Sequence, residues 1–256
     1  MAIQIVGVTN GNFFELLNAD TALGISDYPV TIGGWYRSDE SPGGGRHYGG
    51  FGSAGSPFQS IGLQRIASGG DRWAGRHEGA SGAALSDSSD RTPALTIENG
   101  TWRHIVVVAT SSTSVELFID AVTCTANTTD VGTPTWHDTF YLGSDAQLNG
   151  GAQEPNCTYA EIAIFGAALS PTAISNWFNG GTGRAANDPL VGSPAAYWTL
   201  DEAVSSTMSD SIGSNDLSAN GGTTGMAQVT HPVGPFGGGS SIPAIANHYR
   251  RRRSCC

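Results

Sequence analysis

The sequence predicts an all-β protein: a two-sheet antiparallel jelly-roll sandwich with one short helix and a C-terminal tail. Three observations lead to this class. Short runs rich in β-branched and aromatic residues recur along the 256-residue chain, bounded by Gly, Ser, Asn or Asp. The 36 glycines follow no collagen-like period, which indicates many tight turns between strands. Only one stretch carries helix signals at both of its ends.

The clearest strands form a hairpin in the middle of the chain. Residues 100–109 include an unbroken run of isoleucine and valine, which is typical of a buried strand. Residues 111–114 supply a turn, and residues 115–120 return as the partner strand. The Gly- and Ser-rich segment 38–55 is interpreted as a loop. Further strands are expected at residues 28–37, 58–66, 72–77, 140–143, 159–165, 196–200 and 215–218.

The predicted helix follows Ser170, a residue type that commonly caps helix N-termini. Pro171 occupies the first helical position, where a missing N–H costs nothing. Ile174, Trp177 and Phe178 fall on one helical face, and a Gly-Gly pair ends the segment. We therefore expect a short helix that lies against the sandwich.

The charge distribution separates a body from a tail. The net charge is −10, and because the chain has no lysine, all twelve cationic side chains are arginines. Four of these are consecutive, at Arg250, Arg251, Arg252 and Arg253, so the rest of the chain has 8 − 22 = −14. Such a body repels nucleic acid and anionic membranes. We also find no signal peptide and no apolar run long enough to span a membrane.

Composition divides the chain into three parts. Residues 1–233 are expected to form one domain, followed by a Gly/Ser linker at 234–241 and a tail at 242–256. Four cysteines, two of them terminal, make no disulfide framework for a domain of this size. Cys124 and Cys157 can pair if their strands are neighbours; buried thiols are the favoured alternative.

Four segments, in order along the chain, resemble motifs of the laminin-G-like, concanavalin A-like jelly-roll family. They read YPVTIGGWYR, TWRHIVVVATSSTSVELFID, FYLGSD and YAEIAIFGAALSPTAISNWF. Ala121 stands where that family usually has glycine, and Ala160-Glu161 stands where it often has Asp-Glu. The resemblance covers about residues 3–205 and implies a lectin-like sandwich.

A fifth segment resembles the motif that usually opens such domains, but here it comes late. It reads AAYWTLDEAVSSTMSDSIGSNDLS, and the ending IPAIANHYRRRR follows it. This permuted order is similar to uncultured marine bacterial and bacteriophage sequences, and the ending resembles tails of phage structural proteins. The resemblance implies a virion protein that decorates or cements the capsid or forms an appendage. Its partners would be the major capsid protein or tail components, and it would be a homo-oligomer such as a trimer.

The sequence lacks the pattern of a glycosidase. Jelly-roll hydrolases need two carboxylates across the glycosidic bond, usually on an E-x-D-x-x-E strand. Glu161 has no acidic residue two or five positions further on, and Asp201 and Glu202 are adjacent and would point to opposite faces of a strand. We therefore expect a non-enzymatic protein. His104, in the W-x-H motif, is expected to be a hydrogen-bonded core residue.

Two kinds of ligand are considered. Calcium prefers oxygen ligands from loops, which the sequence offers at Asp120, Asp145 and Asn149, near Glu154; ordinary turn residues are the favoured alternative. No other cofactor is expected. A cell-surface glycan would stack on aromatic side chains, or these side chains instead plug the ends of the sandwich. The glycan-binding candidates are Tyr48, Trp73, Trp136 and His137.

The tail is interpreted as a docking peptide. Ile242, Pro243 and Ile245 would seat in an apolar groove, while Arg250 to Arg253 pair with an acidic partner. The alternative is a solvated, unstructured end. The leading hypothesis is therefore a virion structural protein, assembled in the host cytoplasm and anchored by this tail. The alternative is a free calcium-dependent carbohydrate-binding lectin.

Overall fold

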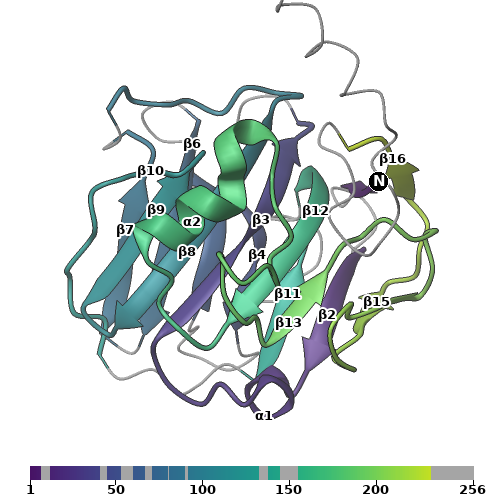
Figure 1. The fold of residues 1–256 in the computed structure, drawn as a ribbon, viewed down its shortest axis with the longest axis horizontal. Coiled ribbons are helices and arrows are strands. Elements are labelled where there is room, and N and C mark those ends of the chain that lie inside the picture. The colour runs from purple at the N-terminus through teal and green to yellow at the C-terminus, as the bar shows by residue number, and fades with distance from the viewer. Residues whose placement is uncertain are drawn as a thin grey trace, which may run out of the picture.

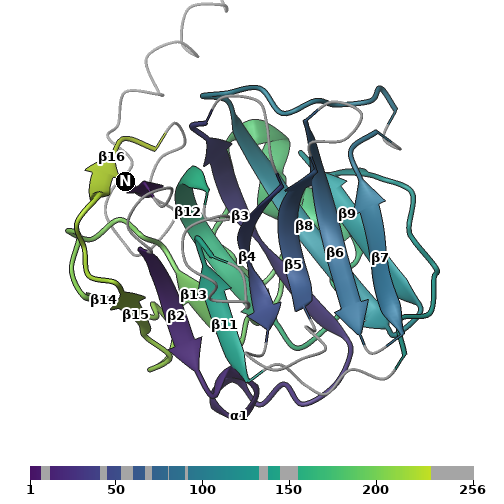
Figure 2. The same cartoon turned by 180° about the vertical axis from the view of Figure 1, so that it is seen from behind.

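A computed structural model describes residues 1–6, 12–40, 45–52, 60–66, 71–79, 81–89, 92–132, 138–144 and 155–231. In this part of the chain two antiparallel sheets of eight strands each pack face to face, which confirms the predicted sandwich (Figures 1 and 2). None of the described helices combines the length and the apolar character that a membrane crossing requires.

The first sheet, sheet A, has the strand order β10-β9-β8-β3-β12-β1-β16, with β13 paired to β12 beside this path. Its centre is the pair β3 and β12, flanked by the predicted hairpin of β8 and β9. The strands are β10 (Val122–Thr123), β9 (Ser114–Ile119), β8 (Trp102–Ser111), β3 (Val30–Ser38), β12 (Asn156–Phe165), β1 (Ala2–Val6), β16 (Met226–Val229) and β13 (Ala196–Trp198).

The second sheet, sheet B, has the strand order β14-β15-β2-β11-β4-β5-β6-β7. It faces the reader in Figure 2. The strands are β14 (Thr207–Met208), β15 (Leu217–Asn220), β2 (Phe13–Leu17), β11 (Thr139–Leu142), β4 (Arg46–Gly52), β5 (Ser60–Ile66), β6 (Arg72–Gly79) and β7 (Gly82–Asp87).

Helix α2 (Pro171–Phe178) forms where the sequence predicts it, continues into a 3₁₀ turn, η1 (Asn179–Gly181), and crosses the outer face of sheet A (Figure 1). The Ser170 hydroxyl accepts a hydrogen bond from the Ala173 N–H at 3.2 Å, as an N-cap should. Ile174 and Trp177 are fully buried. A second helix, α1 (Ala19–Leu23), was not predicted because it is only five residues long.

Strand β4 corrects the prediction that segment 38–55 is a loop. Its glycines are required by the close approach of β5 and do not indicate flexibility. A Cβ on Gly50 would lie 2.3 Å from the Ile61 carbonyl oxygen, and a Cβ on Gly62 would lie 2.3 Å from the Gly49 carbonyl oxygen. A segment rich in glycine was therefore interpreted as a loop although it contains a strand. Strands β1, β2 and β7 were likewise not predicted.

The core lies between the inner faces of the two sheets and is continuous from one end of the sandwich to the other. Phe140 of sheet B and Trp198 of sheet A stack across it with ring centroids 5.5 Å apart. Strand β8 is buried on both faces, because Ile105 and Val107 point into this core while Val106 and Val108 pack beneath α2. This explains the unbroken apolar run that the sequence shows there.

One buried arginine closes an end of the core. Arg65 lies on the inner face of β5 with 1% of its side chain exposed. Its guanidinium contacts the Asp71 carboxylate at 2.8 Å and lies 3.8 Å from Glu40, which also pairs with Arg46 at 3.0 Å. Burial raises the pKa of Glu40 despite these arginines. The paired charges satisfy the buried guanidinium, whose isolated burial would be costly.

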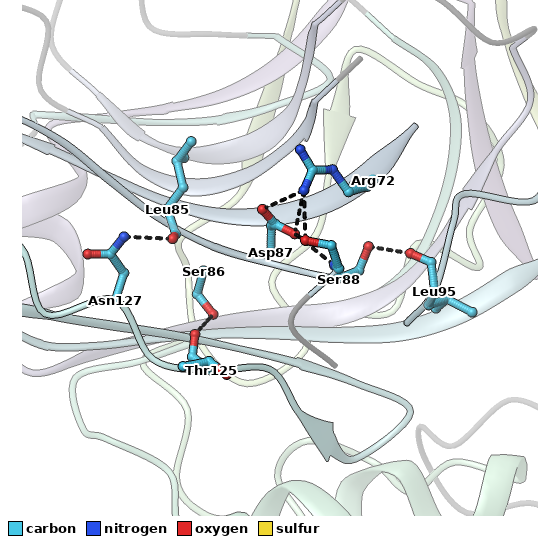
Figure 3. A network of polar contacts seen from close by, with 9 residues as sticks. Arg72, Leu85, Ser86, Asp87, Ser88, Leu95, Thr125 and Asn127 are labelled. Atoms are coloured by element: carbon cyan, nitrogen blue, oxygen red, sulfur yellow. Dashed lines mark hydrogen bonds and ion pairs between the residues drawn. The ribbon is translucent and has the colours of Figure 1, made fainter. Parts of the chain in front are cut away.

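The free edge of sheet B is covered by a segment that belongs to the other sheet (Figure 3). The Ser86 hydroxyl donates to the Thr125 carbonyl oxygen at 2.7 Å, and the Asn127 side-chain amide donates to the Leu85 carbonyl oxygen at 2.9 Å. These bonds join β7 to the chain that follows β10. They protect an edge strand that could otherwise pair with another chain.

The two described cysteines, Cys124 and Cys157, are both buried and form no disulfide with one another. Burial raises the pKa of the Cys157 thiol well above its usual value. The structure therefore agrees with the buried-thiol alternative.

Two histidines, His77 and His104, are also buried. Burial lowers the pKa of His77 to about 4 and that of His104 to about 3. His77 Nε2 shares a hydrogen bond with the Tyr28 hydroxyl. The His104 ring packs edge-on against Trp35 and Trp177, with centroids 5.2 and 4.8 Å away. His104 is thus a core residue, but its ring nitrogens have no hydrogen-bond partner among the described residues, so that part of the expectation is wrong.

Tyr48 and Trp73, two of the four glycan-binding candidates, belong to the core and not to the surface. Their exposed fractions are 0% and 1%, and their rings pack against each other with centroids 4.7 Å apart. Because both point toward sheet A, neither can stack on a sugar. The prediction that they bind glycan is wrong.

We expect Trp73→Ala to lower the free energy of unfolding by about 3–5 kcal/mol, because it leaves a large cavity between the sheets. Urea denaturation followed by circular dichroism measures this. Trp102→Ala is the control, and its effect should be smaller because Trp102 is only partly buried. A Trp73→Ala protein with unchanged stability would contradict this placement.

We expect acid to destabilise the fold through the buried histidines. The pKa of an unfolded histidine is about 6.5, so as the pH falls through that value the unfolded state binds protons that the folded state excludes. Stability is therefore fully present above pH 6.5 and is lost progressively toward about pH 4 for His77 and about pH 3 for His104. Each histidine should contribute on the order of 1–2 kcal/mol between pH 7.5 and 5.

The measurement compares urea unfolding of the parent, His104→Phe and His47→Gln proteins at pH 7.5 and 5.0. The His47→Gln protein is the comparison variant, because His47 is only half-buried, and His104→Phe should show the weaker pH dependence of the two. Identical pH dependence in all three proteins would show that His104 is not held neutral by the fold.

Candidate functional site

The outer faces of the two sheets differ in how they are covered. Helix α2 covers part of the outer face of sheet A, where its Trp177 packs with Val106 and Phe165. Beside the helix, that face carries polar side chains such as Arg37 and Thr158. Over β4–β7 of sheet B, Figure 2 shows no described helix or strand. Because no described helix or strand covers it, this second face is the candidate site.

The outer faces of β5, β6 and β7 carry several polar side chains beside the apolar Ile66, Ala74 and Leu85. Leu63, Trp73 and Ala84 point into the core, and because side chains alternate along a strand, their neighbours point outward. We call the outward-facing set the polar platform; it consists of Gln64, Arg72, Arg76, Glu78 and Asp87.

Arg76 is the centre of one half of the platform. It lies opposite Gly62 of β5, and because glycine has no side chain, the guanidinium can extend across that strand. Its Nη1 donates to the Gln64 side-chain carbonyl at 3.0 Å, and its Nη2 forms an ion pair with Glu78. Gln64 lies two residues from Gly62, the diagonal distance that a long side chain can reach.

Arg72 organises the other half (Figure 3). Its Nη1 donates to both carboxylate oxygens of Asp87, each at 3.1 Å, and to the Ser89 hydroxyl at 2.7 Å. The side chains of these ion pairs remain 16–23% exposed. The platform therefore presents fixed hydrogen-bond donors and acceptors whose formal charges cancel. Such an arrangement can bind a hydroxyl-rich molecule laid flat on the sheet.

The sequence contained a signal for this surface. In the segment Arg72-Trp73-Ala74-Gly75-Arg76-His77, the two arginines alternate with the two ring side chains. On a strand this spacing places the arginines on one face and the rings on the other, so the polar face was the one open to a ligand. Trp73 was nevertheless the glycan-binding candidate, because aromatic residues are common in sugar sites.

Asp120, a calcium candidate, is a turn residue. It adopts a left-handed backbone conformation with φ of 52°, and Ala121 follows with φ of 61°. The Asp120 carboxylate accepts hydrogen bonds from the His104 N–H at 3.0 Å and from Arg103 at 2.8 Å. No group of three or more His, Cys, Asp or Glu that could hold a metal ion occurs in the described ranges. The backbone conformation of Asp120 is that of a turn residue, and its role in calcium binding stays a prediction.

The remaining candidates cannot be placed, because they lie outside the described residues. These are the glycan candidates Trp136 and His137, the calcium candidates Asp145 and Asn149, and the whole docking tail. Their roles stay predictions.

Glu161 is a buried carboxylate that sequence analysis did not recognise as unusual. Only 2% of it is exposed, and it adopts a left-handed conformation, with φ of 55°, at a bulge between Ala160 and Ala163 of β12. The Tyr197 hydroxyl of β13 donates a hydrogen bond to it. This hydrogen bond links β13 to β12. Because the Glu161 carboxylate is buried, it cannot contact a ligand bound at the surface.

Comparisons with known proteins agree on the fold. The family model described as the concanavalin A-like lectin/glucanases superfamily matches residues 11–175. No curated protein matches the chain.

Solved structures with a similar fold include a pentraxin, a domain of an arabinanase and a sialidase. The SAP-like pentraxin of Limulus polyphemus is 14% identical, with 68% of this chain and 80% of that chain covered and a TM-score of 0.47. Domain 4 of the arabinanase AbnA from Geobacillus stearothermophilus, in complex with arabinotriose, is 18% identical (59% and 66%, TM-score 0.43). Trypanosoma rangeli sialidase in complex with sialic acid is 18% identical (64% and 24%, TM-score 0.46), so the chain spans about a quarter of that enzyme. These likenesses concern the fold alone.

The expectation of a non-enzymatic protein is contradicted by these findings. The matching family model is described as one of glucanases as well as lectins. The missing E-x-D-x-x-E pattern excludes one arrangement of carboxylates on one strand, whereas catalytic groups can come from several strands and loops. The described fold and the match over most of its length lead to one identification: the chain belongs to the concanavalin A-like lectin/glucanase superfamily.

Proposed function

We propose that this protein binds carbohydrate and that the polar platform on sheet B is the surface that contacts the sugar. The observation that carries the proposal is the array of fixed donors and acceptors on an open sheet face. Membership of a superfamily of lectins and glucanases supports the same conclusion.

The chemistry of the platform suits sugar hydroxyls, each of which both donates and accepts hydrogen bonds. Arg76 offers N–H groups, and Glu78 offers carboxylate oxygens beside it. Because Gln64 and Glu78 already hold the arginine, a ligand need not order a mobile side chain. The proposal concerns binding of the sugar and not its cleavage. Hydrolysis is therefore measured separately, as release of reducing sugar from the same samples.

We expect purified protein to bind a defined subset of glycans on an array, and Glu78→Ala to weaken that binding about tenfold. Losing a charged hydrogen-bond partner typically costs about 1.5–3 kcal/mol, which corresponds to this factor or more. Isothermal titration calorimetry with the best array ligand measures the change. Repeating the titration with a chelator tests the predicted calcium dependence.

Glu98→Ala is the matched control, since Glu98 also pairs with an arginine, but with Arg103 of sheet A. Absence of binding to every glycan would refute the proposed function. If Glu78→Ala and Glu98→Ala weaken glycan binding equally, the platform is not the binding surface.

A role in a virion is a second proposal, supported by the resemblance of the chain ending and by charge. Each arginine that the structure describes is ion-paired inside the domain. Positive charge for a partner would thus come chiefly from Arg250 to Arg253. Assembly into a trimer or another homo-oligomer remains a prediction of the same resemblance.

Quantitative mass spectrometry of purified particles tests this role. Copy numbers comparable to the major shell protein are expected for capsid decoration, and a few copies per particle for an appendage. If the protein is absent from particles and free in the medium, the virion proposal is wrong and the free lectin gains support.

A further inference from the structure

We propose that the polar platform selects uncharged glycans and that Arg76 is the residue that determines this specificity. The inference rests on the proposed function, because it names the ligand class of the same surface.

Charge balance is the first argument. Arg76 is neutralised by Glu78 and Arg72 by Asp87, so within the platform neither guanidinium is left to compensate an anionic sugar. The whole chain carries a net charge of −10, which adds long-range repulsion toward a polyanion such as a uronate or sulfated polysaccharide.

The positions left open beside Arg76 are the second argument. One N–H of Nη1 goes to Gln64 and one of Nη2 goes to Glu78, so among the described residues each terminal nitrogen keeps a second N–H without a partner. Glu78 uses one carboxylate oxygen for this pair, and its other oxygen remains an acceptor. A donor and an acceptor therefore lie side by side.

A hydroxyl satisfies both positions, because it accepts from the guanidinium and donates to the carboxylate. A carboxylate or sulfate group on a ligand satisfies only the first, and its charge is repelled by Glu78. Glu78 thus disfavours anions while Arg76 binds hydroxyls, so the pair discriminates through attraction and repulsion together.

The experiment compares neutral oligosaccharides of glucose, xylose, arabinose and mannose with oligogalacturonates and sulfated oligosaccharides. Calorimetry is run at about 50 and 500 mM NaCl, a range over which charge-driven binding weakens strongly. We expect neutral ligands to bind, with Kd changing less than about twofold between the two salt concentrations.

Substitutions of Arg76 and Glu78 test whether these two residues determine the specificity. Arg76→Gln should lose at least tenfold in affinity for the neutral ligand, and Arg76→Lys should also weaken binding because it lacks the planar fork. Arg103→Gln is the matched control: its side chain is also ion-paired and also 21% exposed, but it lies on sheet A. Glu78→Gln should shift the preference toward oligogalacturonate, since the repelling charge is removed.

Preferential binding of anionic sugars, with affinity falling as salt rises, would overturn this inference and leave the proposed function standing. So would unchanged specificity in Glu78→Gln and Arg76→Gln proteins that retain the parent circular dichroism spectrum and unfolding midpoint. Absence of binding to every sugar would refute the proposed function itself.

Discussion

Burial of the two inner sheet faces against each other is the constraint on which the rest of the structure depends. Phe140 and Trp198 stack across the interface, and Tyr48 and Trp73 fill the same layer. Because side chains alternate along a strand, fixing which residues point inward also fixes which point outward. The chemistry of each outer face is therefore a consequence of how the core packs, and the candidate site is one such consequence.

The two outer faces use this alternation in opposite ways. Strand β8 carries Val106 and Val108 on its outer side, and the apolar layer that they form is covered by α2. Strand β6 carries Arg72 and Arg76 on its outer side, where the carboxylates of Asp87 and Glu78 balance their charges. The part of sheet A beneath α2 thus extends the apolar core, whereas the outer side of β6 carries two part-exposed ion pairs.

Arginine explains how an acidic chain without lysine builds such a surface. The planar guanidinium can hold two partners in fixed directions, as Arg76 holds Gln64 and Glu78. Buried Arg65 follows the same rule with Asp71 and Glu40. Where the pair is buried it closes the core; where it is part-exposed it presents oriented donors and acceptors. The local environment, not the residue type, separates the structural from the functional role.

The sequence by itself determined the sandwich class, the central hairpin, and helix α2 with its Ser170 cap, because these depend on local periodicity and capping. It did not reveal β4, whose glycines are required by contact with a strand distant in the sequence. It also misplaced Tyr48 and Trp73, since residue type shows only that a ring can stack. Only the tertiary structure decided which face of each strand was covered, because that depends on which sheet or helix packs against it.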